Sequence, residues 1–197
     1  MMVRLLVAAA LATMIAAPAM AGDGKALFEE KGCTACHGED AKTPLQEGYP
    51  RLAGQNAPYA LQQMKDIKSG ARANGLTAET MKPILEDITE EQMKDLADWL
   101  ASLRDQAAKP TGAADHPGRK LFMTKTCVAC HGKEGNKPVL PVYPNIAGQD
   151  KTYILQQTKD IKTGARKNGK SDAMQPVMHL VADAEIDSIA DYLSTVK

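Results

Sequence analysis

Two copies of one short motif constrain this chain more than any other feature. Each copy has two cysteines three residues apart and a histidine directly after the second cysteine. The copies consist of Cys33, Cys36 and His37, and of Cys127, Cys130 and His131. Cysteines at this spacing can bond the two vinyl groups of one porphyrin, and the adjacent histidine can bind its iron. The pattern therefore predicts two covalently attached haem c groups, with His37 and His131 as axial ligands.

Other chemistry of four cysteines has to be weighed against this prediction. Two disulfides are one alternative in an exported protein. Zinc binding is another, but 90 residues separate Cys36 from Cys127, whereas a paired-cysteine zinc site has about 15–20 residues between its pairs. A thioredoxin-like redox motif would need a βαβ context, which is missing here. None of these alternatives requires a histidine after each pair, so haem attachment is favoured.

The motif belongs to a longer internal duplication. Tyr49 corresponds to Tyr143 and Gly54 to Gly148 at an offset of 94 residues, and the offset becomes 93 after Gly75. The repeated unit has the size of a small domain. A segment rich in Ala, Pro and Gly separates the copies and is typical of a linker. The sequence thus predicts domains at residues 22–105 and 118–197, joined by a linker at 106–117.

The first 21 residues have the pattern of a signal peptide. Arg4 supplies the positive charge, residues 5–17 are a 13-residue, mostly apolar stretch, and Ala19-Met20-Ala21 fits the cleavage site. The apolar stretch is shorter than the ~20 residues of a spanning helix. We therefore expect export and cleavage before Gly22, with an uncleaved membrane anchor as the alternative.

Apolar spacing predicts helices and no strands, so the expected fold class is all-α. Asn56 and Asp150 are candidate N-caps for two matched helices. Thr89 begins a capping-box sequence for the last helix of the first half. The helices are expected near residues 57–68 and 151–162, and from Thr89 and about Asp183 onward. Between them, residues 38–55 and 70–89 are expected to be long loops, which in so small a domain usually serve a function or surround something bulky.

A second iron ligand can be sought by comparing the two copies. Of the ten methionines, only Met81 and Met174 occur at matching positions of the mature chain. Each is followed two residues later by proline, which would hold a loop methionine rigidly. His116 and His179 have no histidine counterpart. We therefore predict Met81 and Met174 as sixth ligands, with ordinary loop packing as the alternative.

Charge separates the two halves. The whole chain has 24 Lys/Arg and 24 Asp/Glu, with no basic run, which argues against nucleic-acid binding. Residues 22–109 contain 11 Lys/Arg and 15 Asp/Glu, whereas residues 110–197 contain 12 and 9. An acidic half and a basic half are expected to attract different partners. Aromatic content is only 4%, so each small core needs the apolar surface that a haem would supply.

Both halves resemble class I cytochrome c domains. The tandem pair, with YPxxAGQ and GAR in each half, is similar to the diheme cytochrome c4 family over essentially the whole mature chain. This resemblance implies His/Met-ligated haems and electron transfer in the bacterial periplasm. The implied partners are a terminal oxidase and an upstream quinol-oxidising complex or dehydrogenase. The resemblance also leads us to expect a monomer that can associate peripherally with the membrane.

The resemblance further implies supporting contacts. The carbonyls of Pro50 and Pro144 would accept a hydrogen bond from the proximal imidazole in each half. The first and last helices of each half would cross, with Gly24 and Phe28 at the face of Trp99, and Gly118 and Phe122 at that of Tyr192.

Arg72 and Arg166 occupy matching positions in the GAR segments. A guanidinium pairs well with carboxylates, so haem propionates are natural partners. A solvated charge after a helix is the alternative.

Two rival functions remain at this point. A diheme peroxidase or small diheme dehydrogenase would need an iron with an open or displaceable ligand, and a methionine in both halves argues against it. A haem subunit of a larger complex would show a large exposed apolar patch.

Overall fold

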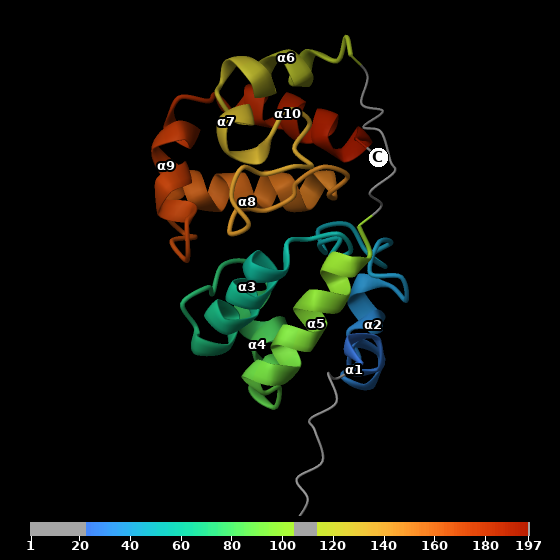
Figure 1. The fold of residues 1–197 in the computed structure, drawn as a ribbon. Helices are drawn as coiled ribbons and strands as arrows, with labels where there is room; N and C mark the ends of the chain where they lie inside the picture. The colour runs from blue at the N-terminus through green and yellow to red at the C-terminus, as the bar shows by residue number, and fades with distance from the viewer. Residues whose placement is uncertain (1–22, 105–113, 197) are drawn as a thin grey trace, which may run out of the picture.

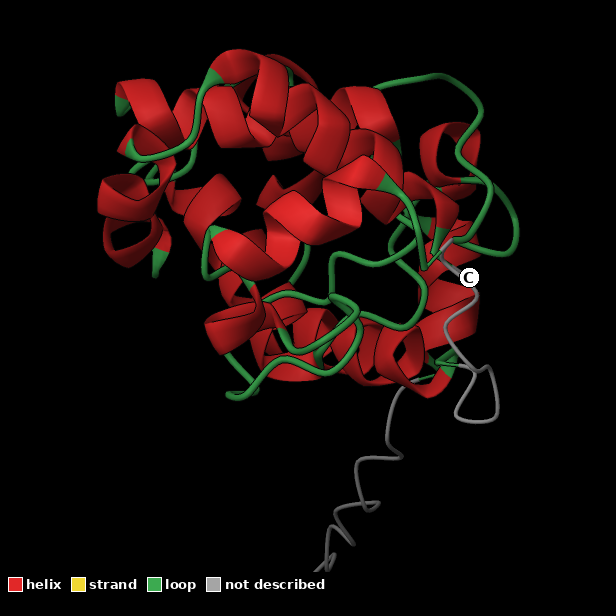
Figure 2. Cartoon of the chain, turned by 90° about the horizontal axis from the view of Figure 1, so that it is seen from above, coloured by secondary structure: helices red, strands yellow, loops and turns green. Residues whose placement is uncertain are grey.

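The structure is a computed structural model that describes residues 23–104 and 114–196. The predicted signal peptide, residues 1–21, lies outside the described residues, as does most of the predicted linker. Throughout both described ranges the regular elements are helices, which confirms the all-α prediction (Figure 2). No helix in these ranges is long and apolar enough to cross a bilayer.

The two halves repeat one order of helices and stack one above the other (Figure 1). The first half contains α1 (Gly24–Glu30), α2 (Thr34–His37), α3 (Ala57–Ser69), the π-helical turn η1 (Thr77–Met81), α4 (Lys82–Glu86) and α5 (Glu90–Ser102). The second half contains α6 (Pro117–Thr124), α7 (Val128–His131), α8 (Lys151–Thr163), α9 (Ser171–His179) and α10 (Asp183–Thr195). Helix α6 begins at the last residue of the predicted linker.

The first and last helices of each half cross in close contact, as the resemblance implied. A Cβ added at Gly24 would lie 2.6 Å from Trp99 Cβ, so only glycine lets α1 approach α5. The rings of Phe28 and Trp99 have centroids 4.9 Å apart. In the second half, Gly118 gives α6 the same approach to Tyr192 of α10, with a Cβ–Cβ distance of 2.8 Å.

Helix caps follow the sequence with one exception. Thr89 and Gln92 form the predicted capping box of α5, and Asp150 accepts a hydrogen bond from Tyr153 N at the start of α8. Asn56 stands at the N-cap position of α3 but makes no cap bond. Its Nδ2 instead donates to the carbonyl of Tyr143 in the other half at 2.6 Å. The predicted capping role of Asn56 was wrong because its Oδ1, the atom that would cap α3, accepts a hydrogen bond from Arg104 Nη2 at 2.6 Å.

The predicted loop at residues 70–89 was also wrong in part. It contains η1 and α4, and its counterpart in the second half contains α9. Met81 therefore ends a helical turn, and Met174 lies inside a helix that also contains Pro176. Pro83 lies in the first turn of α4, where proline is tolerated, whereas Pro176 lies inside α9. A π-helical turn is a local departure from regular α-helix geometry. The methionines are consequently held more firmly than a loop would hold them.

Candidate haem-binding site

The two motif histidines are held by matching hydrogen bonds. Helices α2 and α7 are one turn long and end at His37 and His131. His37 Nδ1 lies 3.0 Å from the carbonyl oxygen of Pro50, and His131 Nδ1 lies 3.1 Å from that of Pro144. A carbonyl can only accept, so Nδ1 carries the proton and Nε2 keeps its lone pair. These are the contacts that the resemblance implied for the two prolines.

Burial keeps both imidazoles neutral. Desolvation lowers the pKa of His37 and of His131, and the bond to the proline carbonyl opposes this only in part. His37 is 4% exposed, and its Nε2 is buried without a hydrogen-bond partner. A buried nitrogen with a free lone pair is costly unless something binds it. An iron atom at this position would satisfy it.

No disulfide joins any of the four cysteines, which argues against the disulfide alternative. Burial is the main cause that raises the pKa of Cys33 and of Cys127 to about 11. A redox-active thiol has a lowered pKa instead, so the thioredoxin-like alternative is not supported. The zinc alternative is not supported either, because in residues 23–104 and 114–196 no three His, Cys, Asp or Glu side chains form a metal-binding group.

A cavity of about 1130 Å³ is lined by residues of both halves. The predicted site residues on its walls are Cys33, Cys36, His37, Pro50, Arg72 and Met81 from the first half, and Cys127, Cys130, His131, Pro144, Arg166 and Met174 from the second. Apolar side chains such as Leu96, Ile161 and Leu193 also line it. The structure thus brings all twelve predicted residues to one cavity, whose apolar walls and bare histidine nitrogen fit a haem in each half.

Met81 and Met174 line this cavity from corresponding positions of the two halves. Met81 packs against the core of the first half, and Met174 packs against that of the second. Both are partly buried. The structure places each methionine and the motif histidine of its own half on the wall of the same cavity.

The two arginines lie at the boundary between the halves, and both are buried, with Arg72 5% and Arg166 8% exposed. This contradicts the alternative that they are solvated charges. Arg72 Nη1 donates to Gln63 Oε1, and its Nη2 donates to Gln157 Oε1, each at 2.9 Å. Arg166 bonds to the same two glutamines at 2.9 and 3.0 Å. Each guanidinium therefore links its own half to the other.

The sequence interpretation missed several residues of this network. Gln63 and Gln157 each accept from both arginines, and Asn74 and Asn168 add further bonds to them. All four are buried. They are identical in the two copies at an offset of 94 residues. The same comparison that selected the methionines would have found them, although glutamine and asparagine were not searched as functional residues.

The network also fits a haem. In the bonds described above, the buried guanidinium groups donate to amide oxygens. Arg72 also donates to the hydroxyl of Tyr153, and Arg166 donates to that of Tyr59. Buried cations are stabilised best by an anion. Because both arginines line the cavity, the propionate groups of bound haem would supply such anions.

Comparison with known proteins decides the family. The cytochrome c family model matches this chain twice, at residues 21–104 and 116–197. A cytochrome c4 of Azotobacter vinelandii is 32% identical over 196 residues, covering 90% of this chain and 89% of the relative. This chain belongs to the cytochrome c4 family. It is an electron-transfer protein that binds haem c.

Two further relatives extend the comparison. A protein of Stutzerimonas stutzeri (strain A1501), named thiosulfate dehydrogenase electron acceptor, is 33% identical over 202 residues, covering 94% of this chain and 91% of the relative. The crystal structure of reduced cytochrome c4 from Pseudomonas stutzeri is similar with a TM-score of 0.72 and 26% identity, covering 90% of this chain and 99% of that one. The tandem pair of cytochrome c domains predicted from the sequence is thereby confirmed.

Proposed function

We propose that the protein carries electrons in the periplasm between respiratory partners, with one covalently bound haem c in each half. Cys33 and Cys36 would attach the first haem, with His37 and Met81 as its axial ligands. Cys127 and Cys130 would attach the second, with His131 and Met174 as its ligands. The single observation that carries the proposal is the buried, partnerless Nε2 of His37 on a cavity wall that also includes Met81.

The surrounding residues explain why this arrangement suits electron transfer. Haem supplies one-electron exchange at its iron. The protein contributes two ligands per iron, and the thioether of methionine favours a high reduction potential. The proline carbonyls fix the histidine rings, which raises ligand basicity. Apolar walls exclude water, and two protein ligands leave no open position for a substrate. This is the reason to prefer a carrier over a diheme peroxidase or dehydrogenase.

Several contacts support a rigid carrier. The buried arginine–glutamine network ties the halves together, so the two haem sites keep one relative position. The joined cavity brings both sites to the same boundary. Electrons could therefore pass within the molecule without a large movement of either half.

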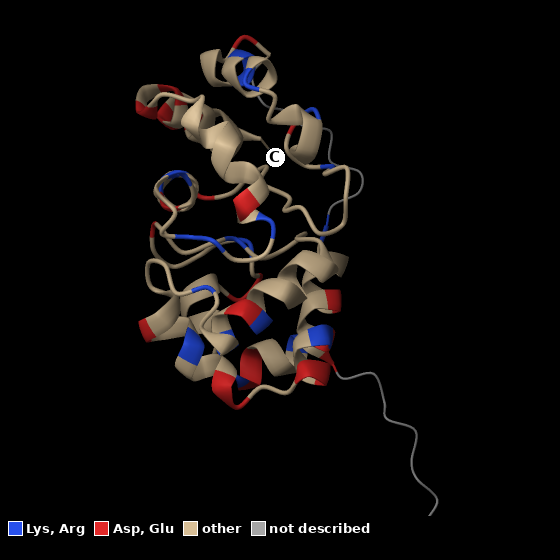
Figure 3. Ribbon diagram, turned by 90° about the vertical axis from the view of Figure 1, so that its left-hand side faces the viewer, with Lys and Arg blue, Asp and Glu red and all other residues tan. Residues whose placement is uncertain are grey.

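For the partners, we propose a terminal oxidase as acceptor and a quinol-oxidising complex or a dehydrogenase as donor. The name of the relative from Stutzerimonas stutzeri points to thiosulfate dehydrogenase as one such donor. The difference in net charge between the halves supports different partners at the two ends. Figure 3 shows that charged residues of both signs lie on each half. Complementary charge chiefly raises association rates, and salt weakens this effect. Rates measured with donor and acceptor at several salt concentrations, on charge-reversed variants of each half, would test this. Equal salt dependence for both sets of variants would contradict it.

The location follows from the predicted signal peptide. We propose cleavage after Ala21 and release into the periplasm as a monomer that associates peripherally with the membrane. N-terminal sequencing of the exported protein would test the cleavage site.

A second candidate, a haem subunit of a larger complex, is favoured by one observation. Val139, Leu140 and Val142 are 59%, 47% and 41% exposed in one loop. This loop is next to the second haem-attachment motif, because Val139 N donates to the carbonyl of Cys130 at 3.0 Å. An exposed apolar patch beside a haem site can contact another protein. Co-purification of a stoichiometric partner from native membranes would support this candidate over a free carrier.

The first experiment is the absorbance of the purified ferric protein, with haem content measured on the same sample. Methionine-bound ferric haem has a weak charge-transfer band at the red edge of the spectrum. We expect two haems per chain and a full band from each, with Met81→Ala and Met174→Ala each removing about half of the band. Leu61→Ala, a variant of a cavity-lining residue that is not a predicted ligand, is the control. Two haems with half the band in the wild type would instead indicate one open iron and turn attention to enzymatic activity.

A further inference from the structure

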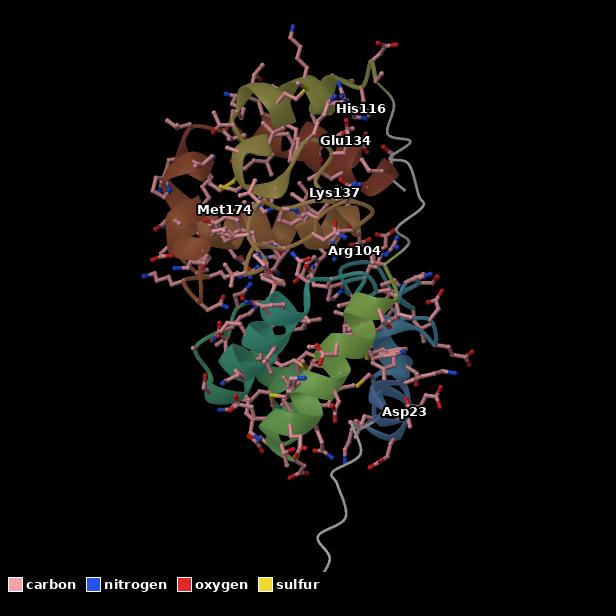
Figure 4. All side chains as sticks on the ribbon, in the orientation of Figure 1. Asp23, Arg104, His116, Glu134, Lys137 and Met174 are labelled. Atoms are coloured by element: carbon pink, nitrogen blue, oxygen red, sulfur yellow. The ribbon has the colours of Figure 1, made fainter. Side chains whose placement is uncertain are left out.

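The two segments that carry the methionines differ in length by one residue. From Thr77 to Met81 the first half has five residues, and from Ser171 to Met174 the second half has four. In the structure the longer segment is the π-helical turn η1, whereas the shorter one is the first turn of α9, where Met174 lies (Figure 4). The difference thus falls within the elements that hold the methionines.

Upstream of the methionines, the two segments are anchored in the same way. The hydroxyl of Thr77 donates to the carbonyl of Asn74 at 2.7 Å, and that of Ser171 donates to the carbonyl of Asn168 at 2.6 Å. All four residues are buried. Both segments therefore start from corresponding, fixed positions.

Downstream of the methionines, the anchors match as well. Ile88 and its counterpart Val181 are 1% and 2% exposed in the cores of the two halves. Their carbonyl oxygens accept hydrogen bonds from Lys68 Nζ and Lys162 Nζ, both at 2.7 Å. Since both ends are held alike, the extra residue of the first half has to be accommodated between the anchors.

The π-helical turn accommodates this extra residue. The amide of Lys82 donates to the carbonyl of Thr77, five positions back, whereas in a regular α-helix the acceptor is four positions back. Such turns are rare and often lie at functional sites. Met81 is consequently at the junction of a wide turn and a helix of five residues, whereas Met174 lies inside one continuous helix of nine residues.

A longer attachment weakens a ligand that belongs to the same chain. Such a ligand competes with free ligands through its effective concentration, which falls when the segment that holds it is longer than the span requires. The second half spans equivalent anchors with one residue fewer, so the segment of the first half is longer than required. The intrinsic affinity of a thioether is the same for both methionines. We therefore expect Met81 to be displaced from its iron more easily than Met174.

Access to the cavity does not distinguish the two halves. Leu76 precedes η1, is 55% exposed and also lines the cavity. Its counterpart Lys170 is exposed and lines the cavity as well. A small molecule could therefore enter beside either methionine, and the length of the segment decides which methionine is displaced.

We propose that the first haem site exchanges Met81 for a small neutral nitrogen donor, whereas the second site keeps Met174. The extra residue between Thr77 and Met81 is the cause. In the exchange, the bond from iron to the Met81 sulfur breaks and a bond to the donor nitrogen forms, without a change of oxidation state. The inference rests on the axial ligands of the proposed function and adds a ligand-binding capacity to one of the two sites.

The test is an imidazole titration of the ferric holoprotein. Loss of the charge-transfer band of methionine-bound ferric haem reports the exchange. We expect two steps of equal size, one of them at an imidazole concentration about tenfold lower than the other. Met81→Ala should show only the step at high concentration, and Met174→Ala should show only the step at low concentration.

Two variants of segment length test the cause. Deletion of Ala78, which is exposed, makes the segment of the first half as long as that of the second and should move its step to high concentration. Insertion of one alanine after Ser171 makes the segment of the second half as long as that of the first and should move its step to low concentration. Ala78→Ser keeps the length and is the matched control, in which both steps should stay in place.

Three outcomes would contradict the inference. Loss of the whole band in a single step in the wild-type protein would overturn the difference between the two sites. Unchanged steps in the insertion variant would overturn the role of the extra residue, even if the deletion variant does not fold. A band that is halved or absent before imidazole is added would overturn the axial ligands of the proposed function, and this inference with them.

Discussion

The most informative perturbation removes the attachment of one haem. In Cys33→Ala/Cys36→Ala the first half keeps its sequence otherwise but cannot bond a haem. The cavity of about 1130 Å³ is shared by two halves, which gives roughly 570 Å³ for each. At about 24 cal/mol per Å³ of unfilled volume, this costs about 14 kcal/mol. Whole domains are stable by only about 5–15 kcal/mol, so we expect the first half to unfold.

Far-UV circular dichroism and thermal unfolding would measure the effect. Because the halves contain matching sets of helices, the variant should lose roughly half of the helical signal, and one cooperative transition with it. Cys127→Ala/Cys130→Ala should give the mirror result. Thr34→Val, which introduces the residue found at Val128 and leaves both thiols, is the matched control. A variant without the first haem that keeps full helicity and a cooperative transition would refute the argument that haem fills the core.

The remaining predictions concern the helix crossing, one pH-dependent contact and one buried charge. Gly118→Ala should lower the free energy of unfolding, measured by urea denaturation, by about 1–3 kcal/mol, because the added Cβ would overlap the backbone of Ser188. Lys120→Ala on the exposed side of α6 is the control, and equal stability of the two variants would contradict this prediction. The hydrogen bond from Arg119 is the main cause that lowers the pKa of Glu134 below its usual 4.5. The ionised Glu134 therefore stabilises the fold fully above pH 4.5, and this stabilisation is lost as the pH falls through the lowered pKa. Tyr192→Phe removes the second partner of Glu134 and should make the urea midpoint less dependent on pH below about 4.5; an unchanged dependence would contradict this. Arg72→Met should lower the haem reduction potentials by tens of millivolts in redox titrations, because a buried positive charge favours the reduced state. Lys94→Met, at an exposed position, should leave the potentials unchanged. Unaltered potentials in both variants would exclude an effect of Arg72.

The helices were predictable where the pattern is local. The capping box at Thr89 and the apolar spacing of α5 depend on residues within a few positions of one another. The segment that carries Met81 was predicted as a loop but folds as η1 and α4. Single-turn helices have too few hydrogen bonds to be stable alone, so packing against the cavity decides them. Sequence periodicity cannot show this.

The role of Asn56 shows the same limit. As an N-cap it would need only the neighbouring backbone, and its position and type fit that role. Its Oδ1 instead accepts from Arg104, 48 residues away in the chain, and its Nδ2 donates to the carbonyl of Tyr143, 87 residues away. A local propensity of about 1 kcal/mol is easily outweighed by such tertiary contacts.

The sequence by itself was enough to predict the haem-attachment cysteines, their histidines and the candidate methionines. Covalent attachment needs contiguous residues at one spacing, and the duplication compares the two copies directly. Only the tertiary structure decided what Arg72 and Arg166 contact and that residues of both halves line one cavity. Those contacts connect residues more than 80 positions apart, and hydrogen bonds over such separations depend on how the halves pack together. No pattern within either half specifies that packing.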